Sequence, residues 1–146
     1  VSIFLFAGMI SVSSAMDKTG AGKLLAKFCV DLLGGTPSPL FVAALLFLVS
    51  SFLTQFMSNT ATATLLCPIG VAIAQQIGAS PHAVVMSITI GIACAYATPV
   101  GTPPNTLVLG PGGYRFMDYV KVGTPLIFVS FIVSMVVIPI VWPFFK

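Results

Sequence analysis

The sequence predicts an all-α, polytopic membrane protein. Of its 146 residues, 58% are hydrophobic and 6% are charged, and the mean hydropathy is +1.11. A soluble domain carries about a quarter charged residues, so this chain lacks the charge to cover a water-facing surface. Long apolar stretches alternate with Gly- and Pro-containing turns, which favours several helices. The net charge of +3 without a basic cluster gives no indication of a nucleic-acid partner.

The N-terminal elements are an apolar run and an amphipathic segment. Residues 1–16 predict most of a transmembrane helix, slightly short of the roughly 20 residues that a span needs. Because the chain begins inside this run, at Val1, we interpret it as an internal-to-C-terminal piece of a longer protein. Residues 20–34 predict a helix in the membrane interface, since apolar and charged side chains lie on opposite faces. Its faces are Leu24, Leu25, Phe28 and Leu32 against Lys23, Lys27 and Asp31.

Residues 39–78 contain two apolar stretches around a polar triplet. We expect helices over 40–56 and 61–77, interrupted at 57–60 by Ser58, Asn59 and Thr60. Polar groups inside apolar sequence must find partners there, so this interruption indicates a site or a specific contact.

A second interruption divides the helical region predicted over residues 82–113. Helix is expected over 83–97, followed by a break at 101–105, because Pro99, Pro103 and Pro104 prevent a continuous helix. A loop over 110–113 and an amphipathic segment over 114–121 come next, and the last transmembrane helix is expected over 120–145.

The two breaks together indicate a transport site. Irregular backbone at membrane depth persists only when it is buried in protein or lines a cavity, and discontinuous helices are typical of transporter sites near the midplane. Ser and Thr also bond back to their own helix, and small residues aid helix packing. A second polar break at Pro104-Asn105-Thr106 favours the site over that alternative.

Each break offers both an anion-binding and a cation-binding end. Ser58 or Asn59 can cap a helix starting near Thr60, and Thr102 can cap one starting at Pro103. Such helix starts present unpaired N–H groups and a positive dipole end, which bind anions without Arg or Lys. The helix ends before them, near 54–57 and 98–101, present unpaired carbonyl oxygens. Neutral oxygens of this kind suit sodium and hold it weakly enough for release.

Three stretches resemble the divalent anion/sodium symporter family, which includes sodium-coupled dicarboxylate, tricarboxylate and sulfate carriers. They are "TQFMSNTATATLLCPIG" (54–70), "TPVGTPPNTLVLG" (98–110) and "FLFAGMISVSSAMDKTG" (4–20). The resemblance implies two inverted repeats, of which this chain is the later part of the second. It further implies a re-entrant hairpin tipped by Ser-Asn-Thr, a helix broken at Thr-Pro-Pro, and access that alternates as these elements move against a scaffold.

The resemblance also implies the site residues. Sodium would be transported and is not a prosthetic group, with Met57 and Gly101 contributing backbone carbonyls. The substrate-binding residues would be Ser58, Asn59, Thr60, Thr102 and Pro103, and the sodium ligands Thr54, Met57, Asn59 and Gly101.

The expected function is sodium-coupled symport of a small divalent anion, most simply a C4-dicarboxylate such as succinate. Alternatives are a sulfate or citrate carrier of the same family, a passive anion channel, or an inactive half-transporter remnant. The expected partners are the anion, the lipid bilayer, an N-terminal repeat that supplies a second Ser-Asn-Thr, and a second copy in a homodimer. The expected location is the bacterial inner membrane.

Several residues leave alternatives open. Gln55 can orient the triplet by hydrogen bonding or can face a polar cavity. The lysine count at Lys18, Lys23 and Lys27 would place that end in the cytoplasm, whereas the family topology places it outside, and we follow the family. The cysteines have neither metal nor redox spacing, and no acidic residue lies inside an apolar run to carry protons. The predicted spans contain no pair of residues typical of a catalytic site, so the sequence does not indicate an enzyme.

Overall fold

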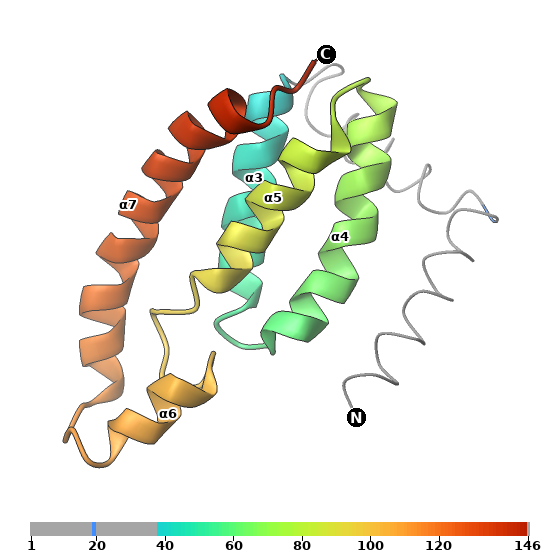
Figure 1. The fold of residues 1–146 in the computed structure, drawn as a ribbon. Coiled ribbons are helices and arrows are strands. Elements are labelled where there is room, and N and C mark those ends of the chain that lie inside the picture. The colour runs from blue at the N-terminus through green and yellow to red at the C-terminus, as the bar shows by residue number, and fades with distance from the viewer. Residues whose placement is uncertain (1–18, 20–37, 146) are drawn as a thin grey trace.

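The computed structural model describes Thr19 and residues 38–145, and within this part the chain is helical, with no strand. The all-α class is therefore confirmed for the described residues. The predictions for residues 1–16 and 20–34 lie outside them. The helices are α3 (Pro39–Leu53), α4 (Asn59–Gln76), α5 (Pro81–Ala93), α6 (Pro103–Leu109) and α7 (Phe116–Val141). In Figure 1, α4, α5 and α7 lie side by side across α3, and α6 lies at the end where the α3–α4 turn is found.

The α3–α4 hairpin is defined by two serine caps. The Ser38 hydroxyl accepts the Phe41 N–H at 3.3 Å, and the Ser58 hydroxyl accepts the Ala61 N–H at 3.2 Å. Of the two predicted N-caps, Ser58 and Asn59, Ser58 is thus confirmed. Helix α4 begins at the next residue, Asn59. Residues 54–58 form the turn between the two helices, so the interruption begins three residues before the expected 57–60.

The core lies between α3, α4 and α5. Helices α3 and α5 approach each other closely at Gly91, where a Cβ atom would contact the Ser50 hydroxyl and come within 2.6 Å of the Phe47 carbonyl oxygen. Glycine therefore permits this backbone-to-backbone approach. The apolar side chains of the core are Val42, Leu46, Leu66, Ile73, Ala74, Val84, Ile88 and Ile92.

The second break differs from its predicted position. Helix α5 ends at Ala93, and residues 94–102 are not helical until α6 begins at Pro103. The expected helix over 83–97 and break at 101–105 were therefore wrong in extent. The reason is that side chains of Gln55 and Asn105 bond to the backbone of residues 94–98 and replace helical partners.

Helix α7 is continuous where two elements were expected. Its start is capped by Asp118, whose carboxylate accepts the Arg115 N–H at 2.8 Å, so most of the amphipathic segment 114–121 and the span form one helix. It ends at Val141, before Pro143. Among the described helices, α7 alone is long and apolar enough to cross a membrane. It packs on α3 through Phe47 and Phe131, whose ring centroids lie 5.4 Å apart.

Candidate functional site

The α3–α4 turn and the break after α5 meet at Thr54 and Gly101. A Cβ atom on Gly101 would lie 3.1 Å from the Thr54 carbonyl oxygen, so the two backbones are in direct contact. The Thr54 hydroxyl donates to the Asn59 side-chain oxygen at 2.6 Å. Thr54 is fully buried, Gly101 is buried and Asn59 is half-buried. Three of the four predicted sodium residues are therefore neighbours, although they come from segments more than 40 residues apart.

Met57, the fourth predicted sodium residue, lies in the same turn. Its side chain is 39% exposed, and its N–H donates to the Leu53 carbonyl at 3.0 Å. The sequence argument uses its carbonyl oxygen and not its side chain, so this exposure does not conflict with that role.

The carbonyl oxygens around this meeting point fall into two groups. Several carbonyls of the turn and the break accept no hydrogen bond from the residues that the structure describes, namely those of Thr54, Phe56, Met57, Tyr96, Ala97, Val100 and Gly101. Other carbonyls nearby accept hydrogen bonds from side chains. These are the carbonyls of Ser51, Gln55, Cys94, Ala95, Thr98 and Pro99. The open set contains Met57 and Gly101, whose carbonyls the resemblance implied as sodium ligands, and also Thr54. The expectation of unpaired carbonyls over 54–57 and 98–101 was wrong for Gln55, Thr98 and Pro99, which accept side-chain hydrogen bonds.

Gln55 joins the two segments. Its side-chain nitrogen donates to the Ser51 carbonyl at 2.8 Å and to the Cys94 carbonyl at 3.0 Å, and its side-chain oxygen accepts the Ala97 N–H at 3.1 Å. Neither alternative left open for Gln55 is observed as stated: the side chain is hydrogen-bonded, but it does not orient the triplet. Its partners are backbone groups of α3 and the break and not the Ser-Asn-Thr triplet. The nearby cavity of about 500 Å³ between α3, the break and α7 is lined mainly by apolar side chains.

The predicted substrate residues lie at two helix starts. Ser58 precedes α4, whose first residues are Asn59 and Thr60, and Thr102 precedes α6, whose first residue is Pro103. Thr102 holds the expected N-cap position, but its side chain makes no cap hydrogen bond, so the expected hydroxyl cap was wrong. Thr102 is half-buried, which leaves its hydroxyl available for another partner.

Asn105 is a functional candidate that the sequence argument missed. Its side-chain nitrogen donates to the Ala95 carbonyl at 2.9 Å and to the Thr98 carbonyl at 3.0 Å, and the Thr106 hydroxyl donates to the Pro99 carbonyl at 2.6 Å. The start of α6 therefore holds the break in shape. The polar pair after Pro104 was a usable signal, because an Asn next to unpaired carbonyls has donors to offer.

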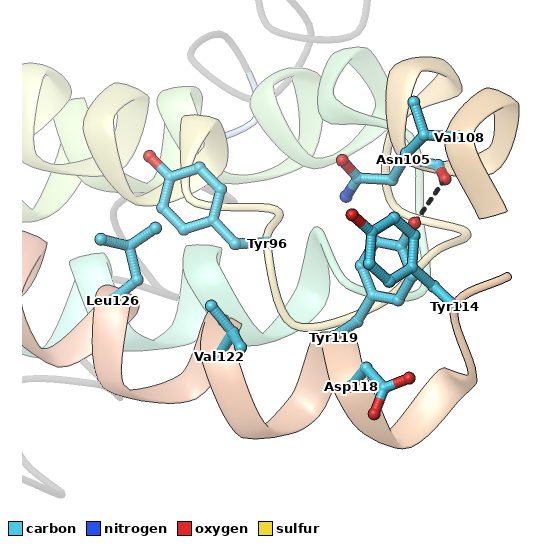
Figure 2. A pocket seen from close by; sticks show the side chains of 9 residues that line it. Tyr96, Asn105, Val108, Tyr114, Asp118, Tyr119, Val122 and Leu126 are labelled. Atoms are coloured by element: carbon cyan, nitrogen blue, oxygen red, sulfur yellow. Dashed lines mark hydrogen bonds between the residues drawn. The ribbon is translucent and has the colours of Figure 1, made fainter. Parts of the chain in front are cut away.

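A second cavity of about 400 Å³ lies between the break, α6 and α7. Figure 2 shows the rings of Tyr114 and Tyr119 beside Asn105, and the Tyr119 hydroxyl donates to the Asn105 carbonyl at 2.9 Å. Tyr96 lies at the other end of the cavity, on the break. The Tyr119 hydrogen bond thus joins the first turn of α6 to α7.

Comparisons with known proteins identify the family of the chain. A citrate transporter family model, CitMHS, matches residues 1–145. The chain is 42% identical over 143 residues to an uncharacterized transporter of Escherichia coli (strain K12), covering 98% of this chain and 23% of that protein. It is 34% identical over 142 residues to a Chlamydomonas reinhardtii protein provisionally named a sulfur deprivation response regulator, covering 96% of this chain and 23% of that protein.

The name of a third relative describes sodium-dependent transport. The chain is 30% identical over 136 residues to the sodium-dependent dicarboxylate transporter of Staphylococcus saprophyticus, covering 93% of this chain and 26% of that protein. The chain thus spans about a quarter of the length of the curated relatives it matches. The family and most of these names describe transporters and not enzymes. The chain belongs to the citrate transporter family, CitMHS, within the divalent anion/sodium symporters that its two breaks resemble.

Proposed function

We propose that this chain carries half of the binding site of an integral-membrane symporter that couples sodium to a small divalent anion. The observation that carries this proposal is the contact of Thr54 and Gly101, with open carbonyl oxygens on both and with Asn59 beside them. Buried carbonyls without partners are costly, and a bound cation satisfies them. All the oxygens involved are neutral, which suits an ion that must also leave.

The anion would bind at the start of α4. The Ser58 hydroxyl already takes the Ala61 N–H, so the N–H groups of Asn59 and Thr60 remain for a ligand. Helix α4 has 18 residues, enough to develop a full dipole. Helix α6 has only seven, so Thr102 and Pro103 would contribute through the hydroxyl and the shape of the backbone. Sodium next to the anion lowers its electrostatic cost, which is a direct basis for coupling.

The helix lengths support a site at membrane depth. Helix α3 has 15 residues and α5 has 13, which gives about 22 and 20 Å at 1.5 Å per residue. Both are shorter than the roughly 30 Å of the hydrocarbon core, so a hairpin and a helix entering from the surfaces would end inside it. We therefore propose the re-entrant hairpin, and with it the movement of hairpin and broken helix against a scaffold.

The remaining assignments follow from family membership. A preceding inverted repeat would supply the second Ser-Asn-Thr and complete the anion site, two copies would form a homodimer, and the location would be a bacterial inner membrane. The substrate would be a C4-dicarboxylate such as succinate, in keeping with the names of the Staphylococcus relatives. Sulfate is the second candidate, because the Chlamydomonas relative is named for sulfur deprivation, and the family description names citrate.

Uptake into proteoliposomes tests this function. The full-length protein that contains this chain would be given radiolabelled succinate under an inward sodium gradient or an equal potassium gradient. We expect accumulation with sodium alone, and competition by unlabelled sulfate and citrate would rank the three anions. Equal uptake in both gradients would contradict sodium coupling and favour a passive channel. Sodium-dependent sulfate uptake without succinate uptake would reassign the substrate and keep the mechanism.

A further inference from the structure

Gln55 is a buried polar side chain whose hydrogen-bonding groups all serve the backbone. It is 6% exposed, and its amide bonds to Ser51 on α3 and to Cys94 and Ala97 in the break. These partners lie up to 42 residues away in the sequence. The amide therefore holds two separate segments at one fixed spacing.

A second connection runs from the same residue to the candidate cation site. The Gln55 carbonyl accepts the Thr98 hydroxyl at 2.8 Å, and the Thr98 oxygen accepts the Gly101 N–H at 3.2 Å. Thr54 directly precedes Gln55 in the chain. Thr54 is thus joined to Gln55 by a peptide bond, and Gly101 is joined through its N–H and the Thr98 hydroxyl to the Gln55 backbone carbonyl. The side-chain amide adds its own bonds to the start of the same break.

We propose that Gln55 is the positioning residue for the cation, and that its amide sets the spacing between the Thr54 and Gly101 oxygens and hence the sodium affinity. The inference rests on the proposed function, since it assigns a role within that sodium site. Gln55 does not touch the ion. Its effect is on sodium binding, and its effect on the anion comes only through the coupling between the two ligands.

Only an amide fills this position completely. The Ser51 and Cys94 carbonyls each need a donor, while the Ala97 N–H needs an acceptor. An ionised carboxylate accepts but cannot donate, and a protonated carboxylic acid donates once. Methionine fills the volume but leaves all three backbone groups unpaired, which carries a desolvation penalty.

The experiment is a thermal-stability titration of the purified full-length protein with sodium. Unfolding temperature would be measured against sodium concentration, with potassium keeping the ionic strength constant, for wild type, Gln55→Met, Gln55→Asn and the control Gln76→Ala. The sodium midpoint is the apparent dissociation constant fitted to the rise in unfolding temperature. Gln76 is an exposed glutamine at the far end of α4. Wild type and the control should share one sodium midpoint. Gln55→Met should raise that midpoint by about tenfold, the effect of losing one or more buried hydrogen bonds.

The sodium midpoint is a readout that a purely structural role would not move. A variant that is only less stable unfolds at a lower temperature at every sodium concentration and keeps the wild-type midpoint. Displaced Thr54 and Gly101 carbonyls instead weaken sodium binding, so more sodium is needed for the same rise in unfolding temperature. Gln55→Asn keeps the amide on a shorter side chain, and its midpoint should lie between those of wild type and Gln55→Met.

The outcomes separate this inference from the proposed function. Gln55 variants that unfold at lower temperature but keep the wild-type sodium midpoint, or that do not fold, would overturn the positioning role and leave a structural one. Sodium stabilisation of wild type without succinate uptake would overturn the substrate assignment alone and leave the inference standing. A wild-type protein that sodium does not stabilise would overturn sodium coupling and, with it, this role of Gln55.

Discussion

Replacing Gly101 with alanine tests the contact between the hairpin and the break. The φ angle of Gly101 is not in the left-handed region, so alanine can adopt its backbone, and only the added methyl group matters. That methyl would lie 3.1 Å from the Thr54 carbonyl oxygen, 3.2 Å from the Ala95 Cβ and 3.3 Å from the Thr98 hydroxyl. All three distances are shorter than the 3.4 Å at which ordinary contact begins.

The size of the effect follows from these distances. The Thr54 oxygen must retreat by 0.3 Å, the difference between 3.4 and 3.1 Å, and it belongs to the backbone at the end of α3, which is buried. Adding a methyl group to a well-packed site costs about 1–3 kcal/mol. If sodium draws the Thr54 and Gly101 oxygens together, about 1–2 kcal/mol of that strain falls on the bound state. This corresponds to a sodium affinity roughly 5 to 30 times weaker.

The assay is sodium-dependent uptake as a function of sodium concentration, with Gly110→Ala as the matched control. A Cβ atom on Gly110 meets nothing within 4 Å, and its φ of −71° suits alanine. We expect a raised half-saturating sodium concentration for Gly101→Ala and an unchanged one for Gly110→Ala. A Gly101→Ala protein that is made in normal amounts and has the wild-type sodium dependence would refute the placement of sodium at this contact.

Three further substitutions extend this reasoning. Asn59→Ala should abolish sodium-dependent uptake, because it removes the amide that bonds to Thr54; uptake with unchanged sodium dependence would exclude Asn59 from the site. Thr102→Val should raise the anion KM about tenfold or more through one lost hydrogen bond to a charged group, without lowering expression, since this hydroxyl makes no cap bond; a change in expression alone would make Thr102 structural. Gly91→Ala should lower the yield of folded protein on size-exclusion chromatography, because its methyl would meet the Phe47 carbonyl oxygen at 2.6 Å; a normal yield would show that the α3–α5 crossing can open.

Features that depend on neighbouring residues could be predicted from the sequence. Features that depend on contacts between distant segments could not. Ser58 as the cap of α4 follows from side-chain chemistry within four residues, and the structure confirms it. The extent of the second break does not follow from such rules. Prolines alone placed it at 101–105, whereas it occupies 94–102, because Gln55 supplies donors and acceptors from 39 to 42 residues away.

The start of α7 shows the same limit at short range. A separate amphipathic segment was expected over residues 114–121, before the span. Asp118 instead caps the helix by accepting the Arg115 N–H at 2.8 Å, so the polar residues form the first turns of one long helix. A capping box is visible in sequence when Ser or Thr opens it; here Arg occupies the cap position, and that signal was absent.

The division of carbonyl oxygens explains why this chain has so many polar side chains beside its breaks. A backbone that leaves helical geometry inside a membrane exposes carbonyls that water cannot reach. Gln55, Asn105 and Thr106 donate to the carbonyls whose positions define the turn. If they bonded to every carbonyl, the break would be rigid and closed to an ion. Because the carbonyls of Thr54 and Gly101 are among those that these side chains leave open, they stay available to a cation under the proposed function.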